Sequence, residues 1–600
     1  MSHRMQYLSL CLVGIVLVGC AGLATNESEA ERGDRQVAVD THTLLAEVAL
    51  ERQQFATAAD ELMQAALISE NPSLAERTTR LAHQLELTEL GLRAADRWNA
   101  LAPEDERPFW FSGVFETRSN RLTRAITEFE AFITAIGDPS TGLALVLEAL
   151  ATEPYADAAT AIMQSLTEAF PGTAAGHYAL ARLALRSGDF ELALDNAAAA
   201  ADSDPDWLDA QLLHARSLLV AGRTADSLAI GARLAEQHAE VEVQLQYAEL
   251  LLSAGRSDEA EVLLNGILAD NPGLPEAVRA LAFLSLTEER LELAKQHFGE
   301  LRGDARYRSE AFYYLGRIAE TEREFLQATR SYSRVTDGTH AVEAQLRTAR
   351  ILFSELGDRD GAVRHLQDFG DANPRFASNM LVAQSQLLLQ MQQPGEAMQL
   401  LDDALAESAD DPTLHAAHVQ LFVILAQDAV ERGQLGEAEK LLGDGLARYT
   451  DNTSLRYSQA LLYEEQGRMR KAVTVLEGLV EDSPEDAALL NALGYLLTDQ
   501  FDRHAEARGY IQKALAMDPD NPAIIDSMGW VLFRLGEHQA ALDYLERAYR
   551  LEADPEIAAH LVDVRWALGD REQALELLRT TLERNPGSRH LQEVSERLGR

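Results

Sequence analysis

A regular pattern of small and apolar residues runs along most of this sequence. It is clearest in the stretch IDSMGWVL (Ile525–Leu532), which leads at helical spacing to Ala541, Leu545 and Ala548. A small residue equivalent to Ala541 recurs through the chain. These residues are Ala59, Ala94, Ala125, Ala159, Ala193, Ser227, Ala260, Ala294, Ala328, Ala362, Ala397, Ala438, Ala472, Ala507, Ala541 and Ala574. Thirteen of the fifteen intervals are 33 to 35 residues; the exceptions are 31 residues after Ala94 and 41 after Ala397.

Two further residue types keep the same phase. Glycine stands five residues before many of these small residues, at Gly188, Gly222, Gly255, Gly357, Gly433, Gly467, Gly536 and Gly569. Proline stands twelve residues after several of them, at Pro171, Pro205, Pro272, Pro374, Pro484 and Pro586. Small residues let two antiparallel helices approach closely, and proline ends the second helix. The pattern therefore predicts helical hairpins repeated about every 34 residues.

This combination resembles the tetratricopeptide repeat (TPR), a 34-residue helix–turn–helix unit. The resemblance implies an all-α chain, an α-α superhelix of about sixteen hairpins from about residue 40 to the end. We expect degenerate hairpins over 40–158, regular repeats over 159–590 and a capping helix over 591–600. The long interval near residues 407–418 indicates either an extended turn or a lengthened helix.

The N-terminal segment follows a different pattern. A basic residue, Arg4, precedes the apolar stretch Tyr7–Val18, which is short for a membrane span. The segment ends in Leu17-Val18-Gly19-Cys20, which resembles a bacterial lipobox. That resemblance implies removal of a signal peptide at residues 1–19 and lipidation of Cys20, with a plain signal peptide or an uncleaved anchor as the alternatives. The polar residues up to 39 are predicted to form a flexible tether.

Charge and composition exclude several classes of protein. The chain has 53 basic and 96 acidic residues, a net charge of −43, and nucleic-acid binding needs clustered basic residues instead. The acidity indicates solubility or a basic partner. Because Cys11 lies in the predicted signal peptide, the mature chain would keep only the lipidated Cys20, which excludes disulfides and cysteine catalysis.

The sequence lacks the motifs of common catalytic sites. It contains no HExxH, GxxxxGK[ST], GxSxG or SxxK motif, so we expect no catalytic residue and no cofactor. Two weak metal patterns have simpler explanations. Asp202, Asp204 and Asp206 have the opening spacing of a calcium loop, but Trp207 replaces its glycine, which favours a turn with an acidic helix N-cap. His415 and His418 are expected to face solvent, and we predict no metal site.

A groove lined by the first helices of the C-terminal hairpins is the candidate binding site. In TPR folds, positions 2, 5, 9, 12 and 13 of the first helix face inward. The residues predicted there are Tyr457, Asn491, Tyr495, Asp526, Trp530, Arg534 and Trp566. Aromatic and amide side chains of this kind suit the binding of a peptide, although Trp530 could simply pack between repeats.

The C-terminal stretches LLNALGYLLTD (489–499), DPDNPAIIDSMGWVLFRLGEHQAALDYLERAY (518–549) and EIAAHLVDVRWALGD (556–570) are similar to those of proteobacterial outer-membrane TPR lipoproteins of the LbcA type. The resemblance implies an adaptor on the periplasmic face of the outer membrane, held by its lipid alone. Its partners would be a carboxy-terminal processing protease and that protease's substrates, the peptidoglycan hydrolases. An envelope-assembly lipoprotein for exopolysaccharide export or outer-membrane protein insertion is the alternative.

Overall fold

The computed structural model describes residues 29–52 and 54–599, and these residues form 33 α-helices and no β-strand. The all-α prediction is confirmed. The predicted signal peptide and Cys20 lie outside the described residues. Contacts between Cα atoms divide the chain into two compact units, Met1–Asp304 and Ala305–Arg600.

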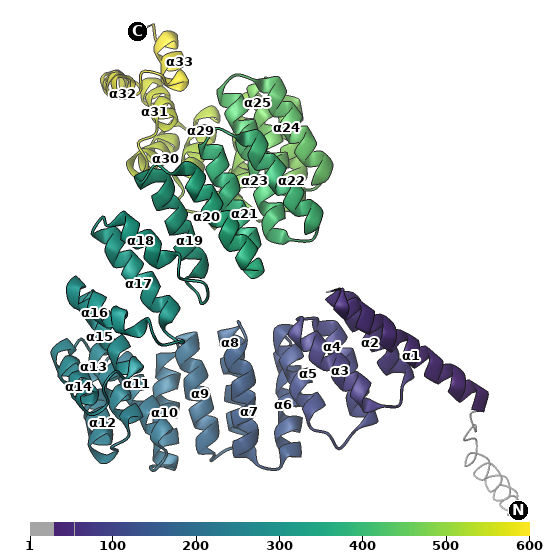
Figure 1. The fold of residues 1–600 in the computed structure, drawn as a ribbon. Helices are drawn as coiled ribbons and strands as arrows, with labels where there is room; N and C mark the ends of the chain where they lie inside the picture. Colours follow the sequence, from purple (N-terminus) through teal and green to yellow (C-terminus); the bar gives the residue numbers. More distant parts are fainter. Residues whose placement is uncertain (1–28, 53, 600) are drawn as a thin grey trace, which may run out of the picture. The chain divides into compact units, whose positions relative to one another are not determined.

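In the part of the first unit that the structure describes, sixteen helices form eight hairpins, each made of an odd-numbered helix followed by an even-numbered one (Figure 1). They are α1 (Glu29–Glu51), α2 (Phe55–Ile68), α3 (Pro72–Gln84), α4 (Thr88–Leu101), α5 (Arg107–Arg118), α6 (Leu122–Ile136), α7 (Pro139–Thr152), α8 (Ala156–Ala169), α9 (Ala174–Ser187), α10 (Phe190–Ser203), α11 (Leu208–Val220), α12 (Thr224–Gln237), α13 (Val241–Ser253), α14 (Ser257–Asp270), α15 (Pro275–Thr287) and α16 (Leu291–Leu301).

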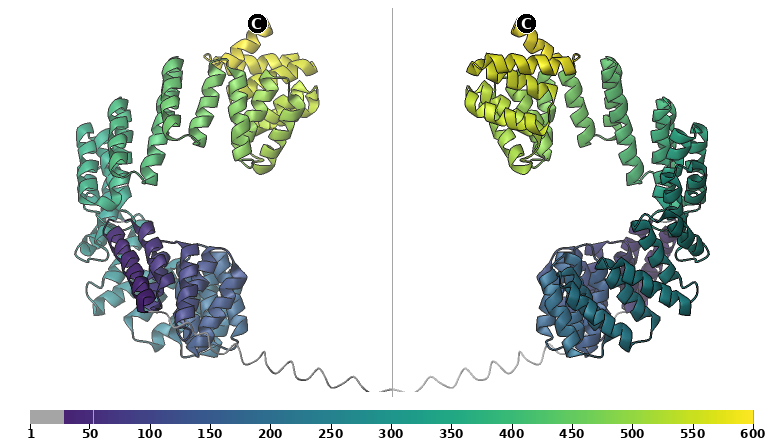
Figure 2. Two further views of the ribbon diagram at one scale, coloured as in Figure 1. Left: turned by 90° about the vertical axis from the view of Figure 1, so that its right-hand side faces the viewer. Right: turned by 90° about the vertical axis from the view of Figure 1, so that its left-hand side faces the viewer.

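The described residues of the second unit form eight more hairpins and a final single helix. Its helices are α17 (Arg308–Thr321), α18 (Phe325–Tyr332), α19 (Ala341–Arg350), continued by a π-helical turn (Ile351–Glu355), α20 (Arg359–Ala372), a 3₁₀ turn (Pro374–Phe376), α21 (Ala377–Gln390), α22 (Pro394–Glu407), α23 (Pro412–Glu431), α24 (Leu435–Arg448), α25 (Thr453–Glu465), α26 (Met469–Asp482), α27 (Ala487–Gln500), α28 (His504–Met517), α29 (Pro522–Arg534), α30 (His538–Leu551), α31 (Pro555–Leu568), α32 (Arg571–Arg584) and α33 (Arg589–Arg597). Figure 2 shows the stacked helices from two further sides.

The hairpin of α29 and α30 shows why the sequence pattern repeats. Gly536 between the two helices has a φ of +83°, a left-handed conformation that suits glycine, and the Glu537 N–H donates to the carbonyl of Leu532 across the turn. Ala541, the fourth residue of α30, is fully buried. A Cβ on Gly529 would lie only 3.2 Å from the Ala541 carbonyl oxygen, so the helices cross where both residues are small. The predicted hairpin is confirmed here.

Two of the predicted small residues are wrong. The left-handed residue of the α3–α4 turn is Glu86, and the residue five positions later is Gly91, not Ala94. The Gly91 N–H donates to Leu87, as the Ala125 N–H donates to Arg121 in the next hairpin. The interval from Gly91 to Ala125 is therefore 34 residues and the irregular spacing disappears. In α2 the equivalent residue is Ala58, not Ala59, because its N–H donates to Gln54 at the turn.

The predicted tether is helical over much of its length. Helix α1 begins at Glu29, so the expectation of a flexible segment up to residue 39 is wrong for residues 29–39. Val39, Ala46 and Ala49 are buried and anchor the C-terminal half of α1, which packs against α2. Once these residues hold the helix, its extension toward the N-terminus costs little, because a helix propagates more easily than it starts.

The irregular interval after Ala397 is a lengthened helix. Helix α23 runs for 20 residues from Pro412 to Glu431, against 13 or 14 in most first helices. The chain closes with α33, from Arg589 to Arg597, in the region predicted to be a capping helix. Leu591 and Val594 of α33 are buried against the apolar cluster of α31 and α32.

Candidate functional site

The first helices of the last hairpins line a hollow of about 1680 Å³ in the second unit. Helices α25, α27, α29 and α31 each contribute side chains spaced three or four residues apart, and α33 contributes the last wall. Such spacing places these side chains on one face of each helix. Because a first helix recurs once in every hairpin, the wall of the hollow repeats with the period of the hairpins.

Five of the predicted groove residues line this hollow: Tyr457, Asn491, Tyr495, Asp526 and Trp530. Their role in binding stays a prediction. The structure places the other two elsewhere. Arg534 is the last residue of α29, and its Nη2 lies 2.8 Å from the Oδ1 of Asp502 in the turn between α27 and α28. Trp566 packs in the apolar cluster between α31 and α32, under the guanidinium of Arg571 at 5.2 Å.

A buried ion pair stands at the centre of the wall. The Nδ1 of His560 lies 3.0 Å from both carboxylate oxygens of Asp526, and each residue is almost fully buried. Burial opposes a charge on His560, but the carboxylate of Asp526 outweighs it, so the pKa of His560 lies above its ordinary value. The imidazole also stacks on the indole of Trp530, with 4.1 Å between ring centroids. Trp530 therefore packs between repeats and still lines the hollow.

A second polar contact joins α27 to α31. The hydroxyl of Tyr495 donates a hydrogen bond of 2.6 Å to Glu556 Oε1. Burial first, and the charge of Glu556 second, raise the pKa of Tyr495 far above its usual range, so the phenol stays protonated as a donor. This bond ties two hairpins together that are separated by a third.

The hollow is strongly acidic. Twelve carboxylates line it, against two arginines and two histidines. Glu464 on α25 is half-buried and forms no side-chain hydrogen bond or ion pair with any other described residue. Burial, followed by the charges of Glu465 and Asp499, raises the pKa of Glu464. Desolvation and repulsion by neighbouring carboxylates therefore both destabilise the ionised form of Glu464.

Two buried polar atoms of the wall also lack partners among residues 29–52 and 54–599. They are the indole nitrogen Nε1 of Trp530 and the amide oxygen Oδ1 of Asn491. Trp530 is only 8% exposed. A buried donor or acceptor without a partner costs about 1–3 kcal/mol, which a bound ligand can recover. One donor and one acceptor in the wall are complementary to a peptide group.

The residues His560, Glu556 and Asp563 belong to this wall and were not among the sequence predictions. A signal for His560 exists in the sequence. Asn491, Asp526 and His560 follow one another at intervals of 35 and 34 residues, which is the repeat length. Asp563 accepts a hydrogen bond of 2.6 Å from the Arg597 Nη2 on α33, so the capping helix completes the wall.

The two weak metal patterns form other structures. His418 is buried, so the expectation that it faces solvent is wrong. The Tyr449 hydroxyl lies 2.9 Å from the Nδ1 of His418 and 3.0 Å from that of His415, and burial lowers the pKa of His418. The acidic N-cap expected near Asp204 is also wrong, because Trp207 is the N-cap residue of α11.

Within the described ranges, no group of three or more His, Cys, Asp or Glu side chains is arranged to hold a metal ion. The same ranges contain no helix whose length and apolar character would let it cross a bilayer.

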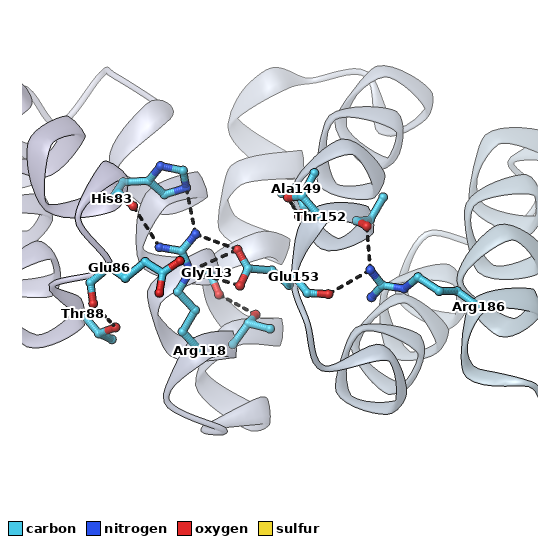
Figure 3. A network of polar contacts seen from close by, with 11 residues as sticks. His83, Glu86, Thr88, Gly113, Arg118, Ala149, Thr152, Glu153 and Arg186 are labelled. Carbon is cyan, nitrogen blue, oxygen red and sulfur yellow. Dashed lines mark hydrogen bonds and ion pairs between the residues drawn. The ribbon is translucent and has the colours of Figure 1, made fainter. Parts of the chain in front are cut away.

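A different kind of polar network joins the N-terminal hairpins (Figure 3). The guanidinium of Arg118, at the end of α5, forms two-pronged contacts with the buried carboxylate of Glu153 at 2.8–3.1 Å. It also donates a hydrogen bond to the carbonyl of His83. Arg186 donates a hydrogen bond of 2.8 Å to the backbone carbonyl of Glu153. His83, Arg118 and Glu153 are 35 residues apart in turn. The network therefore links equivalent ends of successive hairpins, which is a structural role.

Comparison with known proteins gives consistent matches. Models of the tetratricopeptide repeat match residues 143–206, 178–242, 241–284, 343–375, 425–473, 457–522 and 532–598, together more than half of the chain. A relative, the TPR repeat-containing protein PA4667 of Pseudomonas aeruginosa, is 27% identical over 584 residues, which are 93% of this chain and 90% of the relative.

Solved structures with similar folds include two that differ greatly in length. The structure of Naa15/Naa10 bound to HypK-THB contains a chain that covers 91% of this one at 12% identity, with 99% of its own length matched and a TM-score of 0.35. The TPR protein TTC0263 of Thermus thermophilus covers 30% of this chain at 22% identity, with 98% of its own length matched and a TM-score of 0.27.

Proposed function

Because the chain belongs to the tetratricopeptide repeat proteins, we propose that it is a scaffold that binds other proteins in the hollow lined by α25 to α33. The observation that carries the proposal is the wall itself. It combines aromatic side chains, an acidic surface and two buried polar atoms without partners among the described residues. A volume of about 1680 Å³ exceeds the roughly 300–1,000 Å³ of typical small-molecule sites and suits a polypeptide segment.

The scaffold in this proposal supplies no catalytic group. It acts by proximity, since two proteins held on one scaffold meet at an effective concentration on the order of millimolar. The similarity of residues 489–499, 518–549 and 556–570 to LbcA-type lipoproteins supports a finer version. In that version the partners are a carboxy-terminal processing protease and its peptidoglycan-hydrolase substrates, brought together on the periplasmic face of the outer membrane.

The test of binding is affinity capture from periplasmic extract with the purified chain lacking residues 1–19. Ala488 lines the hollow and is exposed, so Ala488→Tyr should obstruct it without disturbing the core. Ala505 on α28 is also exposed and lies outside the hollow, so Ala505→Tyr is the matched control. We expect the wild type and Ala505→Tyr to capture the same protein, identified by mass spectrometry, and Ala488→Tyr to lose it. Equal capture by all three would contradict the proposed site.

The identity of the partner is tested separately. A PDZ-containing serine protease with its nucleophile replaced, which traps complexes, should be captured by the wild type. If no such protease appears, the protease-adaptor version is wrong while the scaffold remains. For localisation, Cys20→Ser should release a folded protein from the membrane fraction, and continued membrane attachment would contradict lipidation at Cys20.

A further inference from the structure

We propose that the segment bound in this hollow is an extended stretch of a partner protein that carries arginine or lysine side chains, one of which pairs with Glu464. The inference rests on the proposed function, because it specifies the chemistry of the ligand for the same hollow. It follows from the way charges are paired within the wall, from the burial of Glu464 and from the two polar atoms without partners among residues 29–52 and 54–599.

The basic side chains of the wall already have acidic neighbours. His560 is paired with Asp526, Arg597 with Asp563 and Arg589 with Glu593. His590 lies 3.8 Å from Glu556, whose other oxygen accepts the hydrogen bond of Tyr495. With twelve carboxylates in the wall, these contacts leave most of the negative charge uncompensated. An incoming cation is attracted, and a like-charged segment is rejected.

Glu464 is the carboxylate of the wall that a bound cation would stabilise most. It is half-buried, its pKa is raised by burial and then by the charges of Glu465 and Asp499, and it has no partner among the described residues. A guanidinium or ammonium beside it would remove the repulsion and replace the lost hydration with charge-assisted hydrogen bonds. The free protein therefore holds an unfavourable charge that a bound cation stabilises.

The two polar atoms that find no partner in the described part of the chain indicate a polypeptide rather than a bare cation. The indole N–H of Trp530, which is 8% exposed, needs an acceptor, and Asn491 Oδ1 needs a donor. A metal ion or a polyamine offers no acceptor to an indole N–H. A peptide backbone offers a carbonyl and an N–H at every residue, so it can satisfy both atoms while its side chains reach the carboxylates.

The test uses a fluorescein-labelled peptide of repeated Arg-Leu-Ser triplets and a second peptide in which citrulline, a neutral isostere, replaces arginine. Both are titrated by fluorescence anisotropy against the chain lacking residues 1–19. Glu464→Gln removes the candidate acceptor. Glu572→Gln removes the same charge from the exposed start of α32, outside the hollow, and controls for the overall acidity of the chain.

We expect the arginine peptide to bind and the citrulline peptide to bind much more weakly. Because Glu464→Gln removes one charge-assisted hydrogen bond, we expect it to weaken binding of the arginine peptide by roughly tenfold or more. We expect Glu572→Gln to change the affinity for that peptide by less than about twofold. Trp530→Phe keeps the ring stacked on His560 but removes the donor, and we expect about a fivefold loss. Spermine and Ca²⁺ should displace the arginine peptide only at concentrations high enough to screen charges in general.

Thermal unfolding of the same variants separates binding from folding. Because Glu464 is destabilised by its surroundings, Glu464→Gln should unfold at the same temperature as the wild type or a higher one, although it binds less well. Equal binding of the two peptides, equal effects of Glu464→Gln and Glu572→Gln, or full competition by spermine would overturn the inference. The proposed function would then still stand if Ala488→Tyr abolished capture of the partner, because that experiment does not depend on charge.

Discussion

Asp526 and His560 occupy equivalent positions in neighbouring hairpins and form a buried ion pair, with the imidazole Nδ1 3.0 Å from each carboxylate oxygen. Burial works against the charge on His560, but Asp526 and, more weakly, Glu556 and Asp563 favour it. The pair joins α29 to α31 and holds the ring that stacks on Trp530. The arrangement of this wall therefore depends on the charge of His560, which its neighbouring carboxylates favour.

The first prediction concerns pH. The pKa of His560 is raised in the folded protein, so its contribution to stability is fully present below about 6.5, the ordinary value, and is lost as the pH rises through the folded-state pKa. The difference in unfolding temperature between wild type and His560→Asn should therefore shrink as the pH rises above about 6.5. His238→Asn, at a partly exposed site, is the control. A difference that stays constant between about pH 5.5 and pH 9 would contradict the charged pair.

The second prediction concerns Tyr495, whose hydroxyl bridges from α27 to Glu556 on α31. Tyr495→Phe keeps the ring and removes this hydrogen bond, so the free energy of unfolding should fall by roughly 1–2 kcal/mol. Tyr155→Phe, at an exposed residue before α8, should change it by less than about 0.5 kcal/mol. Urea denaturation followed by circular dichroism measures both. Equal effects would show that the bridge contributes nothing.

The hairpins and the inward faces of the C-terminal first helices could be predicted from the sequence, because both follow from a spacing. A small residue equivalent to Ala541 recurs through the chain and a glycine equivalent to Gly536 in many of the turns. The i, i+4 pairs Asn491–Tyr495 and Asp526–Trp530 follow the same spacing into the hollow. Following the same register to His560 would have identified a side chain of α31 that lines the hollow, in place of Trp566.

Other features depend on contacts that spacing does not reveal. Ala94 and Gly91 lie on one helix and are both small, so the choice between them depends on the turn at Glu86, a residue type that seldom adopts positive φ. The sequence alone does not decide which side of α31 the ring of Trp566 faces. In the structure it packs against the apolar cluster that α31 forms with α32 and α33. The surroundings of Glu464 include Asp499 and Glu556 from other hairpins, which the spacing within α25 does not reveal.

The third prediction concerns the network of the N-terminal hairpins. Glu153 is 4% exposed, so Arg118→Met would leave a buried carboxylate without its main partner and should destabilise the protein by about 3–5 kcal/mol. The double change Arg118→Met with Glu153→Met removes both charges, and its cost should be clearly smaller. Thermal unfolding of the single and double variants gives the coupling. Additive losses would contradict a mutual dependence of the two side chains.

The last prediction tests the corrected repeat register. A Cβ on Gly91 would lie 2.2 Å from the ring of Phe115, which is fully buried, so Gly91→Ala must displace a packed aromatic side chain. We expect a loss of about 1–3 kcal/mol. Gly266 on α14 is the matched control, since it is helical and exposed and its Cβ would meet nothing within 4 Å. Gly266→Ala should raise the free energy of unfolding by about 0.5–1 kcal/mol through helix propensity alone. Changes of the same sign at both sites, measured by urea denaturation, would show that Gly91 does not occupy the close helix crossing.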